Sequence, residues 1–235
     1  FGGDGGRGPP HREQEGAPEI PPLASNQLRL VVPFFMADPR PLFIIGCPRS
    51  GTGLLHQLVR LHPDLAWITP LTSWAWGRNV ASSVGIGPLR TVERTLQATP
   101  RSLRPPFLRG PFDGSLDVPG VPETSEGHAL WNRHCPTAPH HYLTADDVTD
   151  EAAAFFRAMV NWHQRYFDCP RFVGKTPRHL LRIRYLHALF PDAIFVHLIR
   201  DGRAVMASLL KRRRRDAGDV ETWWGARPPG WQAVQ

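Results

Sequence analysis

The sequence contains few cysteines, almost no lysine and no long hydrophobic run. Its three cysteines, Cys47, Cys135 and Cys169, have neither the spacing of a metal site nor the even number of a disulfide framework. No run of about 18 apolar residues predicts a membrane span, and no signal-peptide pattern is present. We therefore expect a cytoplasmic protein without a bound metal ion.

Lysine occurs only at Lys175 and Lys211, so arginine carries nearly all of the positive charge. Lys and Arg together number 28 against 21 Asp and Glu, which gives a formal charge of +7 over 235 residues. Such a balance favours anionic partners, for example a nucleotide or a nucleic acid. The basic run from Lys211 to Arg215 fits cations at the end of a helix better than a nucleic-acid patch. Nucleic acid is therefore the less favoured partner.

A phosphate-binding turn is predicted after residue 45. The apolar run from Leu42 to Ile45 indicates a buried parallel strand, and apolar residues with helical spacing follow from Leu54 onward. The glycine-rich turn between them brings unpaired backbone N–H groups and the positive end of a helix dipole to one point, where an anion binds. The residues predicted to bind this anion are Arg49, Ser50, Gly51, Thr52 and Gly53.

This turn lacks the lysine of the loops that bind nucleoside triphosphates. Those loops end G-x-x-x-x-G-K-[ST], with the lysine at the β- and γ-phosphates and the hydroxyl at Mg²⁺. No lysine stands beside Gly51 or Gly53, and the turn is shorter. A P-loop kinase is therefore the weakest alternative that we consider.

A second strand, turn and helix are predicted toward the C-terminus. Ile194 to Ile199 indicates another buried strand, Asp201 is a candidate helix N-cap, and the helix is predicted from Gly202 to about Lys211. Arg200 stands at the carboxyl end of the strand, where ligands bind in open α/β sheets. Ser208 follows about two helical turns later, so Arg200 and Ser208 can face one phosphate group.

These features together resemble the sulfotransferase family. The resemblance rests on the turn Gly46–Gly53, on Arg200-Asp-Gly-Arg-Ala-Val-Met-Ala-Ser208, and on Gly174-Lys-Thr-Pro177 between them. It covers about residues 41–224 and is closest to the branch of tyrosylprotein sulfotransferases and bacterial relatives. It implies transfer of a sulfuryl group from 3′-phosphoadenosine 5′-phosphosulfate (PAPS) to an acceptor hydroxyl or amine, without a metal ion.

The same resemblance implies a role for each motif. The first turn would bind the 5′-phosphosulfate of PAPS, and the pair of Arg200 and Ser208 would bind its 3′-phosphate. Lys175 would contact the bridging oxygen and the sulfuryl group during transfer. Charge grows on the departing phosphate oxygen in such a reaction, so positioning and electrostatic stabilisation by these groups carry most of the catalysis.

A general base is needed to take the proton of the acceptor. The tyrosylprotein branch has a glutamate soon after the first helix, and this sequence has none there. We prefer Glu126 as the base, with Glu123 and His128 as alternatives and His56 as a further candidate. Glu126 also fits a purely structural role as an acidic residue in the first turn of a helix.

The predicted fold is α/β: a P-loop-type parallel sheet flanked by helices, with a long irregular insertion over about residues 100–123. Residues 1–25 are rich in Gly and Pro and are expected to be disordered. Residues 26–235 are expected to form one sulfotransferase-like domain whose C-terminal part is missing. Two further helices are predicted, one opening at Thr149-Asp-Glu and one from Pro177 to Phe190.

A non-catalytic function stays open beside the enzymatic one. A sulfotransferase-like or basic anion-binding protein would use the same turn and the same arginines to hold an anion without transferring a group. Binding of adenosine 3′,5′-bisphosphate without sulfuryl transfer to any acceptor would favour this second function.

Overall fold

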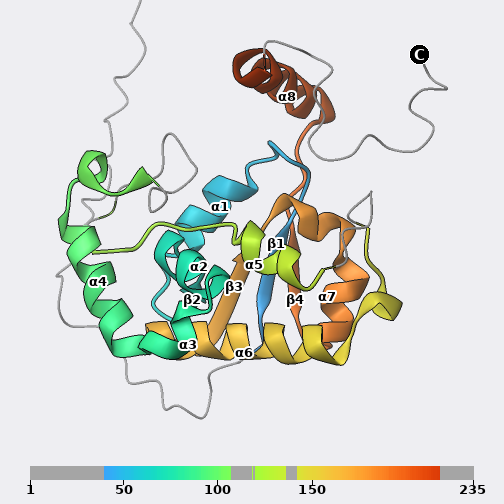
Figure 1. The fold of residues 1–235 in the computed structure, drawn as a ribbon. Coiled ribbons are helices and arrows are strands. Elements are labelled where there is room, and N and C mark those ends of the chain that lie inside the picture. The colour runs from blue at the N-terminus through green and yellow to red at the C-terminus, as the bar shows by residue number, and fades with distance from the viewer. Residues whose placement is uncertain (1–39, 107–117, 119, 136–141, 218–235) are drawn as a thin grey trace, which may run out of the picture. The chain divides into compact units, whose positions relative to one another are not determined.

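The computed structural model describes residues 40–106, 118, 120–135 and 142–217 (Figure 1). The predicted disorder of residues 1–25, half of the predicted irregular insertion and everything after residue 217 lie outside the described residues.

Four parallel strands form one sheet in the order β2-β3-β1-β4. Their bounds are β1 (Leu42–Ile45), β2 (Leu65–Trp67), β3 (Arg171–Lys175) and β4 (Ile194–His197). Because all the strands run the same way, their carboxyl ends meet at one edge of the sheet, where open α/β folds bind ligands. The predicted α/β architecture is confirmed.

Eight α-helices accompany this sheet in the described residues, joined by short 3₁₀ turns. The helices are α1 (Thr52–Val59), α2 (Pro70–Gly77), α3 (Val80–Val84), α4 (Ile86–Ala98), α5 (His128–Arg133), α6 (Asp150–Phe167), α7 (Ile183–Leu189) and α8 (Gly202–Ala217). The 3₁₀ turns are η2 (Arg101–Leu103), η4 (Ala145–Asp147) and η5 (Pro177–Leu181). Helix α6 begins where the sequence predicts it, because the Thr149 side chain accepts a hydrogen bond from the Ala152 amide.

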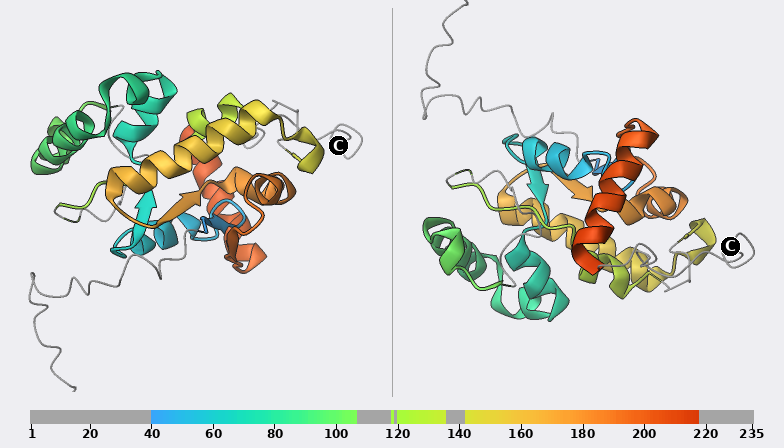
Figure 2. Two further views of the ribbon diagram at one scale, coloured as in Figure 1. Left: turned by 90° about the horizontal axis from the view of Figure 1, so that it is seen from below. Right: turned by 90° about the horizontal axis from the view of Figure 1, so that it is seen from above.

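Neighbouring residues of the central strands face opposite sides of the sheet. Phe43 and Phe172 join the core that contains residues of α5, α6 and α7. Ile44 and Val173 join a second cluster, against which residues of α1 pack. Helices α1 and α6 accordingly lie on opposite sides of the sheet (Figure 2). Lys175 is two residues beyond Val173, so the alternation places its side chain on the face of α1.

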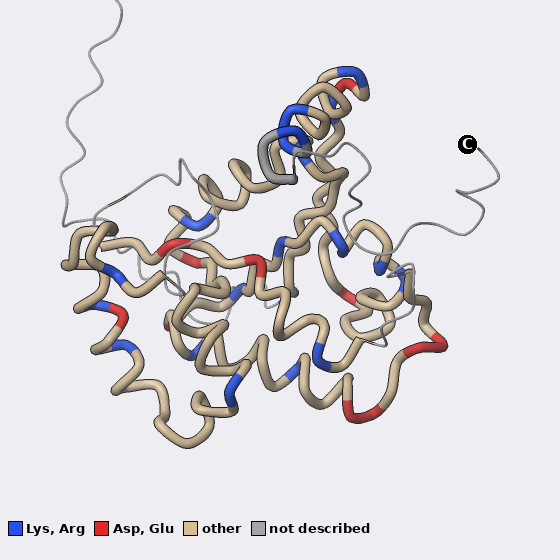
Figure 3. Tube along the Cα trace, turned by 45° about the horizontal axis from the view of Figure 1, so that its top comes forward, with Lys and Arg blue, Asp and Glu red and all other residues tan. Residues whose placement is uncertain are grey.

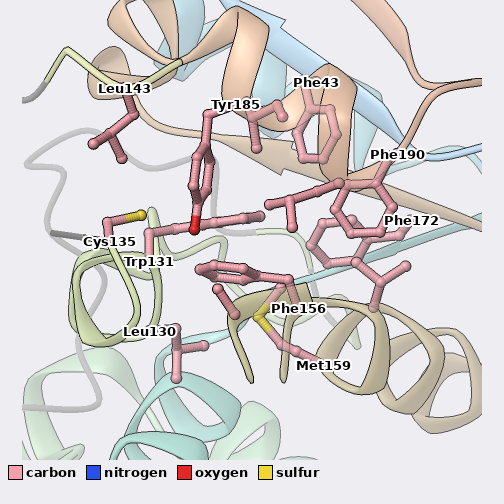
Figure 4. Close-up of a cluster of buried hydrophobic side chains, with 14 of the residues drawn as sticks. Phe43, Leu130, Trp131, Cys135, Leu143, Phe156, Met159, Phe172, Tyr185 and Phe190 are labelled. Carbon is pink, nitrogen blue, oxygen red and sulfur yellow. The ribbon is translucent and has the colours of Figure 1, made fainter. Parts of the chain in front are cut away.

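The larger core contains six aromatic side chains among its fifteen buried residues (Figure 4). The ring of Trp131 stacks on Phe156 with centroids 4.9 Å apart and meets the ring of Phe43 edge-on at 6.0 Å. Trp131 is 1 % exposed and Phe43 is fully buried. This packing fixes α5 against the sheet, and α5 begins at His128, beside the carboxyl end of β3.

Two predicted elements differ from the structure. The predicted continuous helix from Pro177 to Phe190 is instead the 3₁₀ turn η5 followed by α7. The break falls at Arg182, whose backbone leaves the helical region and whose side chain lies buried between Cys135 and Asn132. The helix predicted from Gly202 to Lys211 begins correctly but extends to Ala217.

The strand predicted over Ile194–Ile199 is shorter and less buried than expected. It ends at His197, and its residues are partly or largely exposed. Among the described strands β4 pairs only with β1, so one of its edges has no strand beside it. Ile199 follows the strand in extended chain and is 79 % exposed. An apolar run shows that a segment suits a sheet but does not show whether it lies at the edge.

Candidate active site

A pocket of about 260 Å³ lies at the carboxyl ends of β1 and β3. It is lined by the turn after β1, the first residues of α1, the end of β3, the segment before α5 and one side of α8. The lining contains eight of the nine residues that the sequence predicts for the site: Arg49, Gly51, Thr52, Gly53, Glu126, Lys175, Arg200 and Ser208. The remaining lining residues are Pro48, Leu54, Gln57, Pro177 and Arg212.

Ser50 is the predicted site residue that does not line the pocket. Its side chain is buried, and its hydroxyl donates a hydrogen bond of 2.7 Å to the carbonyl oxygen of Cys47. The Ser50 amide donates to the same oxygen at 3.1 Å. In this structure Ser50 therefore closes the turn, and its predicted contact with the anion stays a prediction.

Two glycines shape this turn. A side chain at Gly46 would place its Cβ 2.7 Å from the backbone oxygen of Leu198, in the segment that leads from β4 to α8. Gly51 precedes α1 with a φ of 103°, a conformation that residues with a Cβ rarely adopt. The turn therefore packs directly on the β4–α8 segment.

Hydrogen bonds of Arg49 and Arg200 connect the two motifs that the sequence predicts to bind anions. The Arg200 guanidinium donates from Nη1 to the carbonyl oxygen of Arg49 at 3.1 Å. In return the Nε of Arg49 donates to Oγ of Ser208 at 3.0 Å. Arg49 holds a φ of 70°, which is unusual for a residue other than glycine and is typical of strained functional sites. The two motifs, about 150 residues apart in sequence, thus contact each other directly.

Helix α8 brings a further arginine to the pocket. Asp201 caps the helix, because its Oδ1 accepts from the amides of Arg203 and Ala204 at 2.9 and 3.1 Å. Arg212 lies one helical turn beyond Ser208 and lines the same pocket. Arg212 was not predicted from the sequence, although its spacing of four residues from Ser208 indicates a shared helix face. Basic residues gather toward the C-terminal part of α8 (Figure 3).

Lys175 and Glu126, which also line the pocket, form a buried ion pair. Nζ of Lys175 donates to Oε1 of Glu126, and both side chains are less than a tenth exposed. The second carboxylate oxygen, Oε2, lies 2.6 Å from Nε2 of His128. The other nitrogen of that imidazole, Nδ1, lies 3.3 Å from the hydroxyl of Thr176. Residues from β3, α5 and the segments beside them therefore hold one carboxylate at both of its oxygens.

These contacts determine the charge of Glu126. Burial by itself raises the pKa of the carboxyl, but the hydrogen bond from His128 and the charge of Lys175 outweigh burial and lower the pKa to about 2. Glu126 is therefore an anion at neutral pH. Burial, reinforced by the positive charge of Lys175, lowers the pKa of His56 to about 3, so this histidine is neutral.

The other three candidate bases do not line the pocket. Glu123 is buried and pairs with the guanidinium of Arg104 at 3.3 Å. His56 is buried on α1 and is not part of the pocket lining. His128 contacts Glu126 and is itself about half exposed. Of the four candidates that the sequence offers, Glu126 is the one that lines the pocket.

Comparison with known proteins agrees with this geometry. A sequence model described as the sulfotransferase family matches residues 41–226, which is most of the chain. The chain belongs to the sulfotransferase family. The match spans both arginine motifs, Lys175 and Glu126, so the pocket is built entirely from the part of the chain that defines the family.

Several curated proteins are similar to this chain. Protein-tyrosine sulfotransferase 1 of Homo sapiens is 27 % identical over 179 residues, which are 75 % of this chain and 35 % of the human protein. The nodulation protein NoeE of Sinorhizobium fredii is 26 % identical over 174 residues, 73 % of this chain and 32 % of that protein.

A third relative differs in the compound that its name specifies. Omega-hydroxy-beta-dihydromenaquinone-9 sulfotransferase Stf3 of Mycobacterium bovis is 29 % identical over 195 residues, 77 % of this chain and 47 % of that protein. This chain therefore spans between about a third and a half of the length of these three relatives.

The described residues contain neither a candidate metal site nor a candidate membrane span. No group of three or more His, Cys, Asp or Glu side chains in the described part of the chain is placed to hold a metal ion. The helices found in the described segments are all too short or too polar to cross a bilayer.

Proposed function

We propose that this member of the sulfotransferase family moves a sulfuryl group from PAPS to an acceptor hydroxyl or amine. The proposal rests on one observation above all: the pocket joins Arg49, Arg200 and Lys175, which come from three separate parts of the chain. A donor with two anionic groups matches a pocket lined by several cationic side chains.

The two motifs would hold different ends of the donor. The turn after β1, with Arg49 and the first amides of α1, binds the 5′-phosphosulfate, because a helix N-terminus and a guanidinium both favour an anion. Arg200 and Ser208 bind the 3′-phosphate, and Arg212 adds a cation from the same side of α8. Arg200 donates to the carbonyl of Arg49 in the turn, so the two proposed phosphate sites would be neighbours.

The transfer itself needs a leaving-group stabiliser and a base. The acceptor oxygen or nitrogen forms a bond to sulfur as the bond between sulfur and the bridging oxygen breaks, and adenosine 3′,5′-bisphosphate leaves with that electron pair. Lys175 stabilises the negative charge that grows on the departing oxygen. Glu126, which lines the same pocket, takes the proton of the acceptor.

The names of two relatives specify hydroxyl compounds: protein tyrosine for one and an omega-hydroxy menaquinone for the other. By analogy, we infer that a hydroxyl is a more suitable acceptor for this chain than an amine.

Isothermal titration calorimetry with adenosine 3′,5′-bisphosphate tests the proposal. We expect the unaltered chain to bind this ligand, and Arg200→Ala to weaken its binding at least tenfold, a loss of about 1.4 kcal/mol. The same substitution should change the affinity for adenosine 5′-monophosphate much less, because that ligand has no 3′-phosphate.

The matched control is Arg203→Ala. Arg203 is an exposed neighbour on α8 that pairs with Asp201 at 3.1 Å and does not line the pocket, so both affinities should be unchanged. Equal losses for the two ligands in Arg200→Ala would show that Arg200 does not bind the 3′-phosphate. No binding of the bisphosphate by the folded chain would reject the proposed function.

A further inference from the structure

Lys175 and Glu126 have roles in the proposed reaction that conflict with their contact. Lys175 must face the oxygen that leaves the sulfuryl group, yet in the structure it donates to Oε1 of Glu126. Glu126 must accept a proton, yet a carboxylate with a pKa of about 2 is a very weak base. Both roles therefore require that the contact between them be broken during the catalytic cycle.

The carboxylate would keep a second anchor if Lys175 moved away. An ionised carboxylate only accepts hydrogen bonds, so the proton between Oε2 of Glu126 and Nε2 of His128 belongs to the imidazole. The hydroxyl of Thr176 can then donate to Nδ1 of the same ring at 3.3 Å. Thr176 thereby orients the ring of His128, and His128 orients the carboxylate of Glu126, without any contribution from Lys175.

We propose that His128 is a positioning residue that holds Glu126 in place while Lys175 exchanges the Glu126 carboxylate for the 5′-phosphate end of the donor. This inference rests on the proposed function and adds to it how donor binding prepares the base. After the exchange, Oε1 of Glu126 is available to the acceptor proton, while Oε2 stays bonded to His128.

The charges around Glu126 determine whether its pKa rises or falls when Lys175 moves away. Four titratable groups act on it: Lys175 from β3, His128 from α5, His56 from α1 and His179 from η5. Burial lowers the pKa of both His56 and His179 below the usual value, so these two are neutral and cannot replace the lysine. When Lys175 leaves, the pKa of Glu126 must rise, because the largest remaining influence is burial.

Proton uptake on ligand binding measures this rise directly. A group whose pKa rises on binding takes up a proton at pH values between its free and bound pKa. We would titrate the full chain with adenosine 3′,5′-bisphosphate in buffers of different ionisation enthalpy, between about pH 4 and pH 7. The phosphates of the ligand also titrate there, so Glu126→Gln, which keeps the shape of the side chain, is the reference protein.

The unaltered chain should take up more protons per bound ligand than Glu126→Gln, with the excess concentrated in the acidic part of the range. Glu126→Gln should also bind the bisphosphate several-fold more tightly at neutral pH, because Lys175 no longer has to leave a carboxylate. Adenosine 3′-monophosphate supplies a matched ligand that offers nothing to Lys175. Its binding should give no excess uptake.

Substitution of His128 tests the positioning role. Without the hydrogen bond from His128 the pKa of Glu126 rises further, so in His128→Ala the excess uptake should move to higher pH while the bisphosphate affinity is kept. His128→Gln, whose amide can still donate to Oε2, should move the excess back toward the original pH. A merely structural role for His128 would weaken folding but leave this pH range unchanged.

The outcomes separate this inference from the proposed function. Failure of every variant to bind the bisphosphate overturns the proposed function. Binding with equal proton uptake in the unaltered chain and Glu126→Gln overturns the exchange of Lys175 and leaves the proposed function standing. An excess that does not move in His128→Ala overturns the positioning role.

Discussion

Single residues of the site show how one carboxylate is kept charged inside the protein. Glu126 is about nine-tenths buried, and removing Lys175 takes away the buried cation that compensates its charge. Breaking a buried ion pair typically costs about 3–5 kcal/mol, whereas replacing both members with apolar residues is often neutral. The lysine and the glutamate therefore depend on each other for stability as well as for chemistry.

This dependence predicts the response of stability to acid. The pKa of Glu126 in the folded chain is depressed to about 2 from a model-peptide value of 4.5, so its contribution is complete above about pH 5. The contribution is lost as the pH falls toward 2 and Glu126 becomes protonated. In Glu126→Gln we expect a lower free energy of unfolding at pH 7 and a shallower fall between about pH 5 and pH 3.

Urea denaturation across this pH range measures both effects. The double variant Lys175→Met with Glu126→Leu is the control: it should be more stable than either single variant at pH 7, because no buried charge is left unpaired. A single variant as stable as the unaltered chain would show that the pair contributes nothing to folding.

The turn after β1 shows what the elements impose on the site. Its backbone touches the segment between β4 and α8 at Gly46, where only a hydrogen atom fits beside the Leu198 oxygen. Both segments follow directly from paired strands, so neither can retreat without disturbing the β1–β4 ladder. The two motifs that are predicted to bind anions therefore meet through their backbones at Gly46, in addition to the side-chain hydrogen bonds of Arg49 and Arg200.

A methyl group at this contact should separate the two motifs. We expect Gly46→Ala to lower the free energy of unfolding by about 1–3 kcal/mol, as overpacking typically does. The affinity for adenosine 3′,5′-bisphosphate should fall with it. Gly87→Ala is the matched control, because a Cβ at Gly87 on α4 meets nothing within 4 Å. Equal stability of the two variants in thermal denaturation would contradict the proposed packing.

The elements also show what the sequence can and cannot predict. The strand, turn and helix around Gly46, the cap of α6 at Thr149 and the cap of α8 at Asp201 follow from patterns within a few residues. The break at Arg182 was not predictable, because it depends on a buried side chain that contacts residues of a distant helix. Similarly, the exposure of β4 depends on the order of strands in the sheet.

The candidate site divides in the same way. The sequence predicts nine catalytic and donor-binding residues, and the pocket brings eight of them together. The sequence favours Glu126 over Glu123 but does not reveal the partners that distinguish them, because Arg104 and Lys175 come from distant positions in the chain. It also misses Arg212, whose position in a basic run obscures its position on a helix face.

At the scale of the whole molecule, the aromatic side chains of the larger core contribute to the stability of the described domain. Trp131 is almost fully buried, stacks on Phe156 and meets Phe43 of the central strand β1. It also lies on the helix that begins at His128. The packing that stabilises the domain therefore also positions the residue that holds Glu126.

Removal of this ring should destabilise the whole domain. Trp131→Ala is expected to lower the free energy of unfolding by about 3–5 kcal/mol, the usual cost of deleting a large buried side chain. Leu103→Ala, at a position that is 73 % exposed, should change it by less than about 0.5 kcal/mol. Chemical denaturation followed by circular dichroism distinguishes these values, and similar stabilities for both variants would contradict the proposed core.

The hydrogen bond from Arg200 to the carbonyl of Arg49 has a consequence for selectivity. If the turn at Arg49 and the guanidinium of Arg200 each bind one phosphate, as proposed, this bond restricts the distance between the two phosphate sites. A ligand whose two anionic groups are separated by that distance would bind at both sites at once. The second contact would then benefit from a high effective concentration. An isomer with the same charge but a different distance between its anionic groups would bind at only one site at a time. The pocket would therefore discriminate between ligands of equal charge by their geometry.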